Sequence, residues 1–303
     1  MGRLVVIDGR RCAPEDAKVS VYDRGFLYGD SVFETVRTYG GSPFALDEHL
    51  QRLEESANAL KIPLPIGRPT LAEEVTTAVD AAANPESRIR IILSRGRGPL
   101  GLDSELAVEP LRVILIEPLE LPPVQHYQDG IGVVCVQTVR ASDAVHSAKL
   151  SNYLASVLAL QDARSAGAQE ALVVNRDGFV VEGTTCNVFI VRHATTGGGG
   201  ESMVCTPPLG IGVLPGITRA FVIGVAAELG LPVNDCTLTP EQIRAADEVF
   251  LTSSIREILP VVTVDGELVG DGRPGGTTRR LHAALRSRVG LGDQPLPWEL
   301  RSL

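Results

Sequence analysis

The chain has 303 residues, of which 44% are hydrophobic and 21% are charged, and its formal net charge at pH 7 is −9. This composition is typical of a soluble globular protein, and the acidic balance argues against a broad nucleic-acid-binding surface. No apolar run approaches the roughly 20 residues that a membrane-spanning helix needs, so we expect neither nucleic acid nor a membrane as a partner. A chain of this length favours two domains or one large one.

The five cysteines are widely spaced and form no C-x-x-C pair. An odd number argues against a disulfide framework, and the spacing argues against a zinc site, so we expect no metal. The apolar run at residues 4–7 is too short for the core of a signal peptide and is followed at once by an Asp-Gly turn. These features favour a reducing compartment, and we expect a cytoplasmic protein.

Strands and helices alternate in the first part of the chain. In the first predicted helix, apolar residues recur at spacings of three and four, and Asp47 is a suitable N-cap. Strands are indicated by β-branched and aromatic residues between glycine turns. The predicted elements are strands at residues 3–7 and 32–39, helices at 47–60 and 70–82, and strands at 89–94 and 111–116.

A proline-rich segment follows. Residues 117–123 contain three prolines, which can continue neither a helix nor a central strand. We interpret the segment as a domain linker, and the alternative is an ordinary surface loop. The predicted organisation is a small N-terminal domain at residues 1–117, a linker at 118–127 and a larger C-terminal domain at 128–303.

The remaining chain is richer in strands, which gives an α+β fold class with two parts. A four-glycine run at residues 197–200 predicts a flexible hairpin tip. The predicted elements are a strand at 131–138, a helix starting near Lys149, a hairpin of 171–175 and 179–182, a strand at 187–192, a helix at 218–230, a short strand leading to 251–254, and a final helix at 277–289.

Lys149 begins the segment Lys149-Leu150-Ser151-Asn152-Tyr153. A single lysine is usually a solvated surface group. Here, however, the predicted helix would carry an apolar stripe that indicates a half-buried setting, formed by Leu150, Leu154, Val157 and Leu158. Burial and the positive end of a helix both disfavour the ammonium form, and a neutral amine is the nucleophile that Schiff-base chemistry requires.

Glu182 lies at the end of a predicted strand in Glu182-Gly183-Thr184-Thr185-Cys186-Asn187. One interpretation is a strand-end carboxylate in water. The functional alternative is a carboxylate that faces a pyridine nitrogen, raises the pKa of that nitrogen and so makes the ring an electron sink.

A third motif, Leu214-Pro215-Gly216-Ile217-Thr218-Arg219, places a glycine before a predicted helix. Backbone N–H groups at a helix start, with the Thr218 hydroxyl, offer a site for a phosphate dianion, although a plain N-cap is equally consistent. Arg52 could add a countercharge, or could be an exposed helix arginine. Together the three motifs supply the amine, carboxylate and helix N-terminus that hold pyridoxal phosphate by its aldehyde, ring nitrogen and phosphate.

With these motifs, the chain resembles the class IV, or fold type IV, pyridoxal-phosphate aminotransferases. That group includes branched-chain and D-amino acid aminotransferases, R-selective amine transaminases and aminodeoxychorismate lyase. The resemblance runs from about Asp8 to the last helix. It also rests on the run from Asp23 to Glu34, on His49-Leu50-Gln51-Arg52-Leu53 and on Thr206-Pro207-Pro208.

The resemblance implies a smaller N-terminal and a larger C-terminal α/β domain, with the cofactor between them and a homodimer completing each site. It implies that Lys149 is the Schiff-base lysine and proton shuttle, that Glu182 pairs with the ring nitrogen, and that Tyr153 binds the phenolic oxygen of the ring. The other implied cofactor residues are Arg52, Gly216, Ile217, Thr218, Ser253 and Ser254 around the phosphate, Leu214 on the ring face and Asn187 in the ring-side network. Phe33 and Arg90 would line the substrate pocket.

The sequence departs from the family pattern at three places. Thr35 stands where typical branched-chain enzymes have glycine, which is closer to the D-amino acid and lyase members. The loop after residues 94–96 lacks the Arg-x-His pair of bacterial D-amino acid aminotransferases, and Arg97 is the basic substrate-binding candidate there. Cys186 occupies a usual serine or threonine position, and we do not interpret it as a nucleophile.

These expectations combine into a ping-pong transamination between an amino acid, of branched-chain or D-amino acid type, and a 2-oxo acid. The nearest alternative is a lyase of the same fold that acts on aminodeoxychorismate and shares every cofactor residue. A non-catalytic relative with a decayed site is the alternative from another class, and the intact Lys149, Tyr153, Glu182 and Arg52 argue against it.

Overall fold

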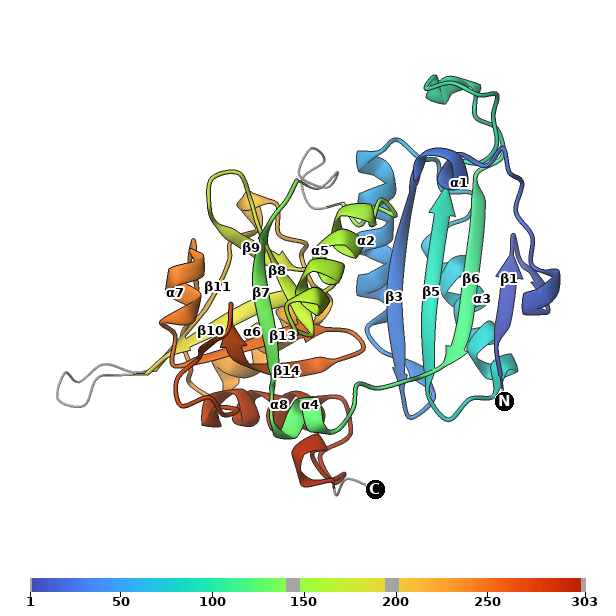
Figure 1. The fold of residues 1–303 in the computed structure, drawn as a ribbon. Helices are drawn as coiled ribbons and strands as arrows, with labels where there is room; N and C mark the ends of the chain where they lie inside the picture. Colours follow the sequence, from blue (N-terminus) through green and yellow to red (C-terminus); the bar gives the residue numbers. More distant parts are fainter. Residues whose placement is uncertain (1, 140–147, 194–201, 301–303) are drawn as a thin grey trace. The chain divides into compact units, whose positions relative to one another are not determined.

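The computed structural model describes residues 2–139, 148–193 and 202–300 (Figure 1). The chain divides into two compact units. Unit 1 comprises Met1–Glu120 with Ser147–Tyr153, and unit 2 comprises Leu121–His146 with Leu154–Leu303. Among the described residues, no helix combines the length and the apolar character that crossing a bilayer requires.

Unit 1 contains an antiparallel sheet in the order β2-β1-β6-β5-β3-β4, with helices α2 and α3 packed on it. Strand β5 shows why one face is covered: Ile89, Ile91 and Leu93 are at most 2% exposed, whereas the alternate Arg88 is exposed. The strands are β1 (Leu4–Ile7), β2 (Arg10–Cys12), β3 (Ser31–Tyr39), β4 (Ser42–Pro43), β5 (Ser87–Ser94) and β6 (Leu111–Pro118). The helices are α1 (Arg24–Tyr28), α2 (Leu46–Ala59) and α3 (Arg68–Ala82), with short 3₁₀ turns at Pro14–Asp16 and Ser104–Leu106.

Unit 2 contains a mixed sheet in the order β12-β11-β10-β13-β14-β7-β8-β9, with β15 paired to β14. The pairs β7–β8, β7–β14 and β11–β12 are parallel. Its strands are β7 (Ile131–Gln137), β8 (Glu170–Val174), β9 (Val180–Gly183), β10 (Asn187–Arg192), β11 (Met203–Thr206), β12 (Val233–Asp235), β13 (Glu248–Ser253), β14 (Glu257–Val264) and β15 (Glu267–Leu268). Its helices are α4 (Gln125–Gln128), α5 (Leu154–Ser165), α6 (Ile217–Glu228), α7 (Pro240–Arg244) and α8 (Gly276–Arg288), with 3₁₀ turns at Leu209–Ile211 and Pro297–Glu299.

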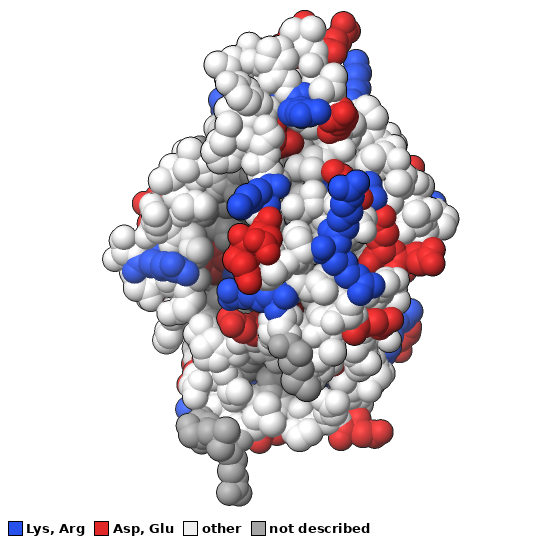
Figure 2. All heavy atoms as spheres, turned by 90° about the vertical axis from the view of Figure 1, so that its right-hand side faces the viewer, with Lys and Arg blue, Asp and Glu red and all other residues white. Residues whose placement is uncertain are grey.

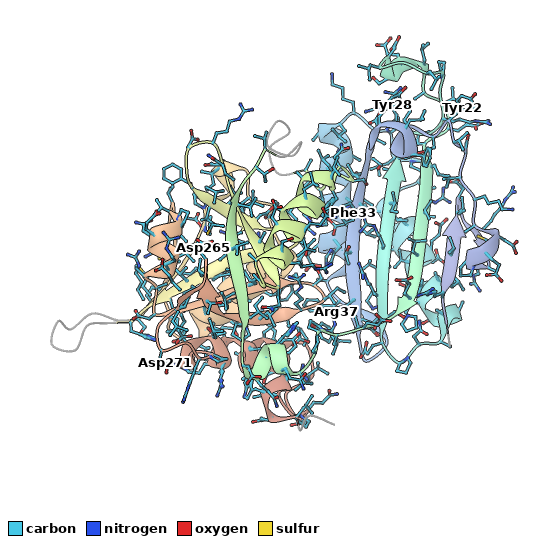
Figure 3. The ribbon with its side chains drawn as sticks, in the orientation of Figure 1. Tyr22, Tyr28, Phe33, Arg37, Asp265 and Asp271 are labelled. Carbon is cyan, nitrogen blue, oxygen red and sulfur yellow. The ribbon has the colours of Figure 1, made fainter. Side chains whose placement is uncertain are left out.

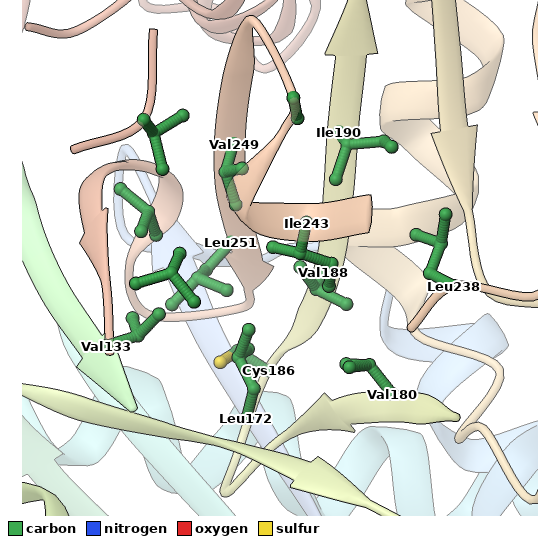
Figure 4. Packing of buried hydrophobic residues seen from close by; sticks show 14 of the residues in the cluster. Val133, Leu172, Val180, Cys186, Val188, Ile190, Leu238, Ile243, Val249 and Leu251 are labelled. Atoms are coloured by element: carbon green, nitrogen blue, oxygen red, sulfur yellow. The ribbon is translucent and has the colours of Figure 1, made fainter. Parts of the chain in front are cut away.

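Strand β10 is buried on both faces, which explains its continuous apolar run. Val188 and Ile190 belong to a core cluster that also contains Leu172 and Leu251 (Figure 4). On the opposite face, Phe189 belongs to a second cluster under α6 and α8, where its ring stacks on that of Phe250 with centroids 4.9 Å apart. The sheet of unit 2 is therefore a rigid layer between two cores.

Charged side chains of both signs are interspersed on the face shown in Figure 2, rather than gathered by sign. Charged side chains also form ion pairs within each unit. In unit 1, for example, the guanidinium of Arg112 lies 2.7 Å from a carboxylate oxygen of Glu74.

The prediction that a helix starts near Lys149 is wrong. The helix α5 begins at Leu154, and the preceding segment runs beside β3 of unit 1, where Leu150 bridges to Val32 and the Ser151 N–H donates to the Ser31 carbonyl. These long-range hydrogen bonds hold the segment beside β3, outside any helix. The predicted apolar stripe is also exposed rather than half-buried over most of its length, at Leu154, Val157 and Leu158.

Helix α2 also begins differently from the prediction. Its first residue is Leu46 and its N-cap is Ala45 in the left-handed region, so Asp47 lies in the first turn instead of at the cap. A carboxylate there still favours the helix through the positive N-terminal end. The four-glycine run at residues 197–200 lies outside the described part of the chain.

Candidate active site

Lys149 is fixed beside strand β3 of unit 1. Its backbone N–H donates to Ser56 Oγ at 3.0 Å, and its carbonyl accepts from the Phe33 N–H at 3.1 Å. The side-chain Nζ lies 4.8 Å from the centroid of the Phe33 ring. The amine is therefore held against an aromatic face by a half-buried segment with a fixed backbone.

The Phe33 ring also contacts Arg90 and Tyr153, the other side chains of unit 1 that were predicted to bind the substrate or the cofactor ring. The Arg90 guanidinium lies 3.7 Å over its ring, and the Tyr153 ring packs edge-on with centroids 5.2 Å apart. The register explains the first contact, because Arg90 pairs with Thr35 and so lies diagonally across from Phe33, which Figure 3 labels on β3. Burial lowers the pKa of Arg90.

Glu34, the next residue of β3, takes part in a buried charge network with helix α2. Its Oε1 accepts from Arg52 Nε, and its Oε2 accepts from Arg52 Nη2 and contacts His49 Nδ1, all at 2.7 Å. The i, i+3 spacing places His49 and Arg52 on one face of the helix. All three residues are at most 6% exposed, so Arg52 is not a solvated helix arginine.

The environment of this network shifts the pKa values of Glu34 and His49. Burial alone would raise the pKa of Glu34, but the Arg52 charge and the hydrogen bond to His49 outweigh it and lower this pKa to about 2. Burial lowers the pKa of His49. A signal for this network was present in the sequence, because an acid within an apolar strand requires a buried partner.

A β-bulge in unit 2 determines the face of the sheet to which the Glu182 side chain points. Val174 pairs with Val180, but the next residue of β8, Val173, pairs with Glu182, so Val181 is an extra residue in β9. Because side chains alternate along a strand, this insertion turns Glu182 to the opposite face from Val180, which belongs to the core cluster of Figure 4. Sequence periodicity alone could not show the change of face.

Asn187 connects Glu182 to the segment before helix α6. Its Nδ2 donates to Glu182 Oε2 at 3.1 Å and to the Leu214 carbonyl at 3.0 Å, while the Leu214 N–H donates to the same carboxylate oxygen at 3.0 Å. Glu182 is only 8% exposed. The alternative of a carboxylate in open water is therefore excluded.

Gly216 is the N-cap of α6, with an ordinary φ of −65°. A Cβ atom there would lie 1.9 Å from Asn187 Oδ1, so glycine is needed for this close approach and not for backbone conformation. Thr218, at the second position of the helix, is buried. The start of α6 thus presents a compact, glycine-led helix N-terminus next to Asn187.

Ser253 and Ser254 lie at the end of β13 and are half-buried. Ser253 Oγ accepts from the Arg256 N–H at 3.4 Å. Thr252, which was not among the predicted site residues, pairs directly with Asn187 across β10 and β13. Its hydroxyl is buried and has no hydrogen-bond partner within the described parts of the chain.

Arg97, the predicted basic candidate of the loop after β5, lies on an exposed part of unit 1. Its Nη2 is 2.6 Å from a carboxylate oxygen of Glu109, and both side chains are more than half exposed. A role for Arg97 in substrate binding stays a prediction.

The donor set fits pyridoxal phosphate. Unit 1 carries an amine, a buried guanidinium and a phenol, and unit 2 carries a buried carboxylate, a helix N-terminus and serine hydroxyls. Each unit also contains a buried hydroxyl without a partner among the described residues, Ser151 Oγ next in sequence to Leu150 and Thr252 Oγ1 opposite Asn187. Orphaned polar atoms of this kind are expected where a polar ligand binds.

The class of protein follows from the comparison with known families. A family model described as amino-transferase class IV matches residues 31–264, and the chain belongs to this family. It is a pyridoxal-phosphate-dependent aminotransferase with the two-part α+β architecture of fold type IV. The relatives favour transamination over the lyase reaction of the same fold.

Individual relatives match over nearly their whole length. The chain is 38% identical over 279 residues to a Methanocaldococcus jannaschii protein assigned as a branched-chain-amino-acid aminotransferase, covering 91% of this chain and 93% of the relative. It is 30% identical over 285 residues to the D-alanine aminotransferase of Bacillus licheniformis, covering 94% and 96%.

Solved structures of aminotransferases have the same fold as this chain. The branched-chain amino acid aminotransferase of Escherichia coli superposes with a TM-score of 0.88 at 30% identity and 98% coverage of both chains. A further branched-chain amino acid aminotransferase, solved with pyridoxamine 5'-phosphate, matches with a TM-score of 0.86 at 29% identity, covering 96% of this chain and 95% of that one.

Gly216→Ala tests the close approach to Asn187. The new Cβ must displace the Asn187 side chain, and loss of its hydrogen bonds to the buried Glu182 costs about 1–3 kcal/mol. We expect pyridoxal phosphate to bind about tenfold more weakly or worse, as measured by titration of the cofactor-free protein. The matched control is Gly224→Ala in the same helix, where the nearest atom lies at 3.8 Å and alanine favours the helix. Equal affinities in both variants would contradict the packing argument.

Glu34→Gln tests the buried network through its pH dependence. A carboxylate whose folded pKa is about 2, against a usual 4.5, contributes about 3 kcal/mol to stability above pH 4.5, and this contribution is lost as the pH falls toward 2. We expect the variant to melt below the wild type at pH 7 and the difference in Tm to shrink steadily below pH 4.5. Thermal unfolding followed by circular dichroism measures this, and a pH-independent difference would contradict the assignment.

Proposed function

We propose that this aminotransferase transfers the amino group of a branched-chain amino acid to a 2-oxo acid, with Lys149 as its catalytic residue. When bound, pyridoxal phosphate supplies an aldehyde that captures the amino group and a ring that accepts electrons from the α-carbon. The backbone of Lys149 is fixed in unit 1 by its hydrogen bond to Ser56. We therefore assign to the Lys149 amine the covalent bond to the cofactor aldehyde. The substrate amino group would displace Nζ from that bond, and the released Nζ would then accept the proton from the substrate α-carbon.

Glu182 is proposed to keep the cofactor ring nitrogen protonated. Its buried carboxylate is held by Asn187 and the Leu214 N–H, which fix its plane and exclude water from one oxygen. A fixed anion stabilises the protonated nitrogen without reorganising during the reaction. Leu214 would pack on the ring face, and Tyr153 would donate to the phenolic oxygen.

The phosphate is assigned to the start of α6 and to Arg52. The N–H groups that follow Gly216 and the positive end of a helix of twelve residues attract a dianion. The Glu34 carboxylate keeps the Arg52 side chain in one orientation. The remaining proposed phosphate contacts are Ile217, Thr218, Ser253 and Ser254.

The substrate assignment rests on the pairing of Arg90 with Phe33. Phe33 is buried under the half-buried Arg90 guanidinium, so the pair presents a surface with a positive charge in apolar surroundings. Such a surface suits an apolar amino acid in one half-reaction and the carboxylate of a 2-oxo dicarboxylic acid in the other. A D-amino acid is the second candidate, supported by Thr35 and by the 30% identical D-alanine aminotransferase.

We also propose that the enzyme is a homodimer. Residues 19–28 and 96–108 of unit 1 are tied together, since the Gly101 N–H donates to Tyr28 Oη and Arg24 donates to the Gly101 carbonyl. Together they expose apolar side chains that are 47–82% accessible, Val19, Val21, Tyr22, Phe26, Leu100, Leu102, Leu106 and Val108. An apolar surface of this extent marks an interface, and a second copy is its most economical partner. The five free thiols are consistent with the proposed cytoplasmic location.

Replacement of Lys149 tests the catalytic assignment. Lys149→Ala should reduce turnover by at least about 10⁴-fold while the fold is kept, because the variant loses the amine for both covalent binding and proton transfer. Borohydride reduction of the wild-type holoenzyme should leave a pyridoxyl adduct on Lys149, identified by peptide mass spectrometry. Glu182→Gln is the companion variant and should slow proton removal while still allowing the adduct. An adduct on another lysine would refute the assignment.

A donor screen tests the substrate proposal. With 2-oxoglutarate as acceptor, L-leucine, L-isoleucine and L-valine should bleach the yellow cofactor and give glutamate faster than either enantiomer of alanine. Pyruvate as acceptor with D-amino acid donors is the comparison arm. Preference for D-alanine over the L-branched-chain donors would replace the first substrate proposal with the second.

Charge placed on the apolar surface tests the homodimer. Leu102→Glu, at a side chain 82% exposed in the single chain, should convert a particle of two chains into one of a single chain, as measured by light scattering. Leu268→Glu, at a side chain 65% exposed on β15 of unit 2, is the control and should leave the mass unchanged. A wild-type mass of one chain would refute the proposal.

A further inference from the structure

We propose that Glu170 and Arg256 are positioning residues for cofactor binding: the buried Glu170–Arg256 pair fixes the turn after Glu182 relative to the turn after Ser254. This inference rests on the proposed roles of Glu182, Ser253 and Ser254. None of the contacts that carry it leaves unit 2.

Glu170, the first residue of β8, is completely buried and uses both carboxylate oxygens. Its Oε1 accepts from the Ala171 N–H at 3.0 Å and from the Thr184 N–H and hydroxyl at 3.2 and 2.5 Å. Its Oε2 accepts from Arg256 Nη1 at 2.5 Å, and the Cys186 thiol lies at 3.8 Å. One carboxylate therefore joins three separate segments of the unit.

Two of these segments, besides β8 itself, adjoin proposed cofactor residues. Thr184 and Cys186 lie in the turn between Glu182 and Asn187. Arg256 follows the turn after β13 and, besides its contact with Glu170, donates its backbone N–H to Ser253 Oγ. Its carbonyl in turn accepts from the Tyr127 hydroxyl at 3.0 Å, so both its backbone and its side chain are held.

Glu170 acts from the core side of the sheet. It shares its strand face with Leu172 and Val174, which belong to the core cluster of Figure 4, whereas Glu182 pairs with Val173 on the other face. Glu170 is thus placed to act through the two turns and not by contact with the cofactor. This is why we describe it as a positioning residue.

Breaking the Glu170–Arg256 pair costs free energy, so substitution of either residue is expected to displace the two turns that the pair joins. A carboxylate without exposure depends on its donors, and removal of the Arg256 cation leaves a buried charge without this compensation. Arg256 is the cation that contacts Glu170, and its side chain is 25% exposed. The thiol of Cys186 adds only a weak donor, and burial, followed by the charge of Glu170, raises its pKa.

The experiment compares paired variants of the holoenzyme. Glu170→Gln and Arg256→Ala break the pair, and Arg256→Lys keeps the cation. The control for the carboxylate is Glu248→Gln, because Glu248 is also buried in the sheet and accepts from the Thr277 and Thr278 N–H groups at the start of α8. The control for the cation is Arg244→Ala, whose guanidinium pairs with Asp265 at 2.7 Å.

Two quantities are measured for each variant, the Tm of the cofactor-free protein and the Kd of pyridoxal phosphate from absorbance on serial dilution. We expect Glu170→Gln and Arg256→Ala to raise Kd at least tenfold, and Arg256→Lys to recover most of the loss. Glu248→Gln and Arg244→Ala should lower Tm with less than a twofold change in Kd. If Glu170→Gln does not fold, the Arg256→Ala and Arg256→Lys pair decides.

The outcomes separate this inference from the function on which it rests. Wild-type protein that binds pyridoxal phosphate on Lys149, with unchanged Kd in both pair-breaking variants, overturns the positioning role alone. Equal increases of Kd in the control variants overturn it too, because any loss of stability would then suffice. Failure of the wild type to form the Lys149 adduct overturns the proposed catalytic assignment and this inference with it.

Discussion

The side-chain amide of Asn187 is the interaction on which the proposed cofactor site of unit 2 depends. Its Nδ2 bonds both the Glu182 carboxylate and the Leu214 carbonyl, and its Oδ1 requires that residue 216 have no side chain. A strand end, a loop and a helix start are thereby held by one planar group. Because β10 is buried on both faces between two apolar clusters, Asn187 itself starts from a rigid position.

Unit 1 uses strand alternation in a comparable way. Successive residues of β3 serve different purposes, since Phe33 collects Lys149, Arg90 and Tyr153 while Glu34 pairs with Arg52 on helix α2. A one-residue shift in the β3–β5 register would exchange these roles. The long antiparallel pairing of β3 with β5, continuous from Ser31 to Arg37, prevents such a shift.

The sequence was sufficient for elements with a strong period of their own. Helices α2 and α3 and strand β10 begin and end within about two residues of the predicted limits, because their apolar spacing reflects the face that they bury. Strand β14 was not among the predicted elements. It contains Pro260, a residue that is unusual in a central strand, and Pro260 pairs with Phe250 inside the sheet. The residues on either side of Pro260, Leu259 and Val261, pair with Leu251 and Val249 of β13 and so continue the strand.

In the candidate site, too, some features could be predicted from the sequence and others could not. Motif order was enough to select Lys149, Glu182 and the start of α6, but not to explain how they are held. The backbone position of Lys149 is fixed by hydrogen bonds to residues more than 90 positions away, and the face to which Glu182 points is set by a bulge. Both features depend on residues of other strands or helices, which the hydrophobic period of a single segment cannot reveal. The Glu34 network was missed for a related reason, because its members lie on different elements.

Two cysteines in the sheet of unit 2, the half-buried Cys135 and the buried Cys205, bear on how the enzyme responds to oxidants. Burial, with the nearby Asp265 charge, raises the pKa of Cys135 to about 12, and burial with the neighbouring Cys236 raises that of Cys205 to about 12. Thiols of this kind are almost entirely protonated at physiological pH, and the protonated form reacts slowly with peroxides and alkylating reagents. Cys135 and Cys205 are thereby kept in the slow-reacting protonated form within the sheet of unit 2.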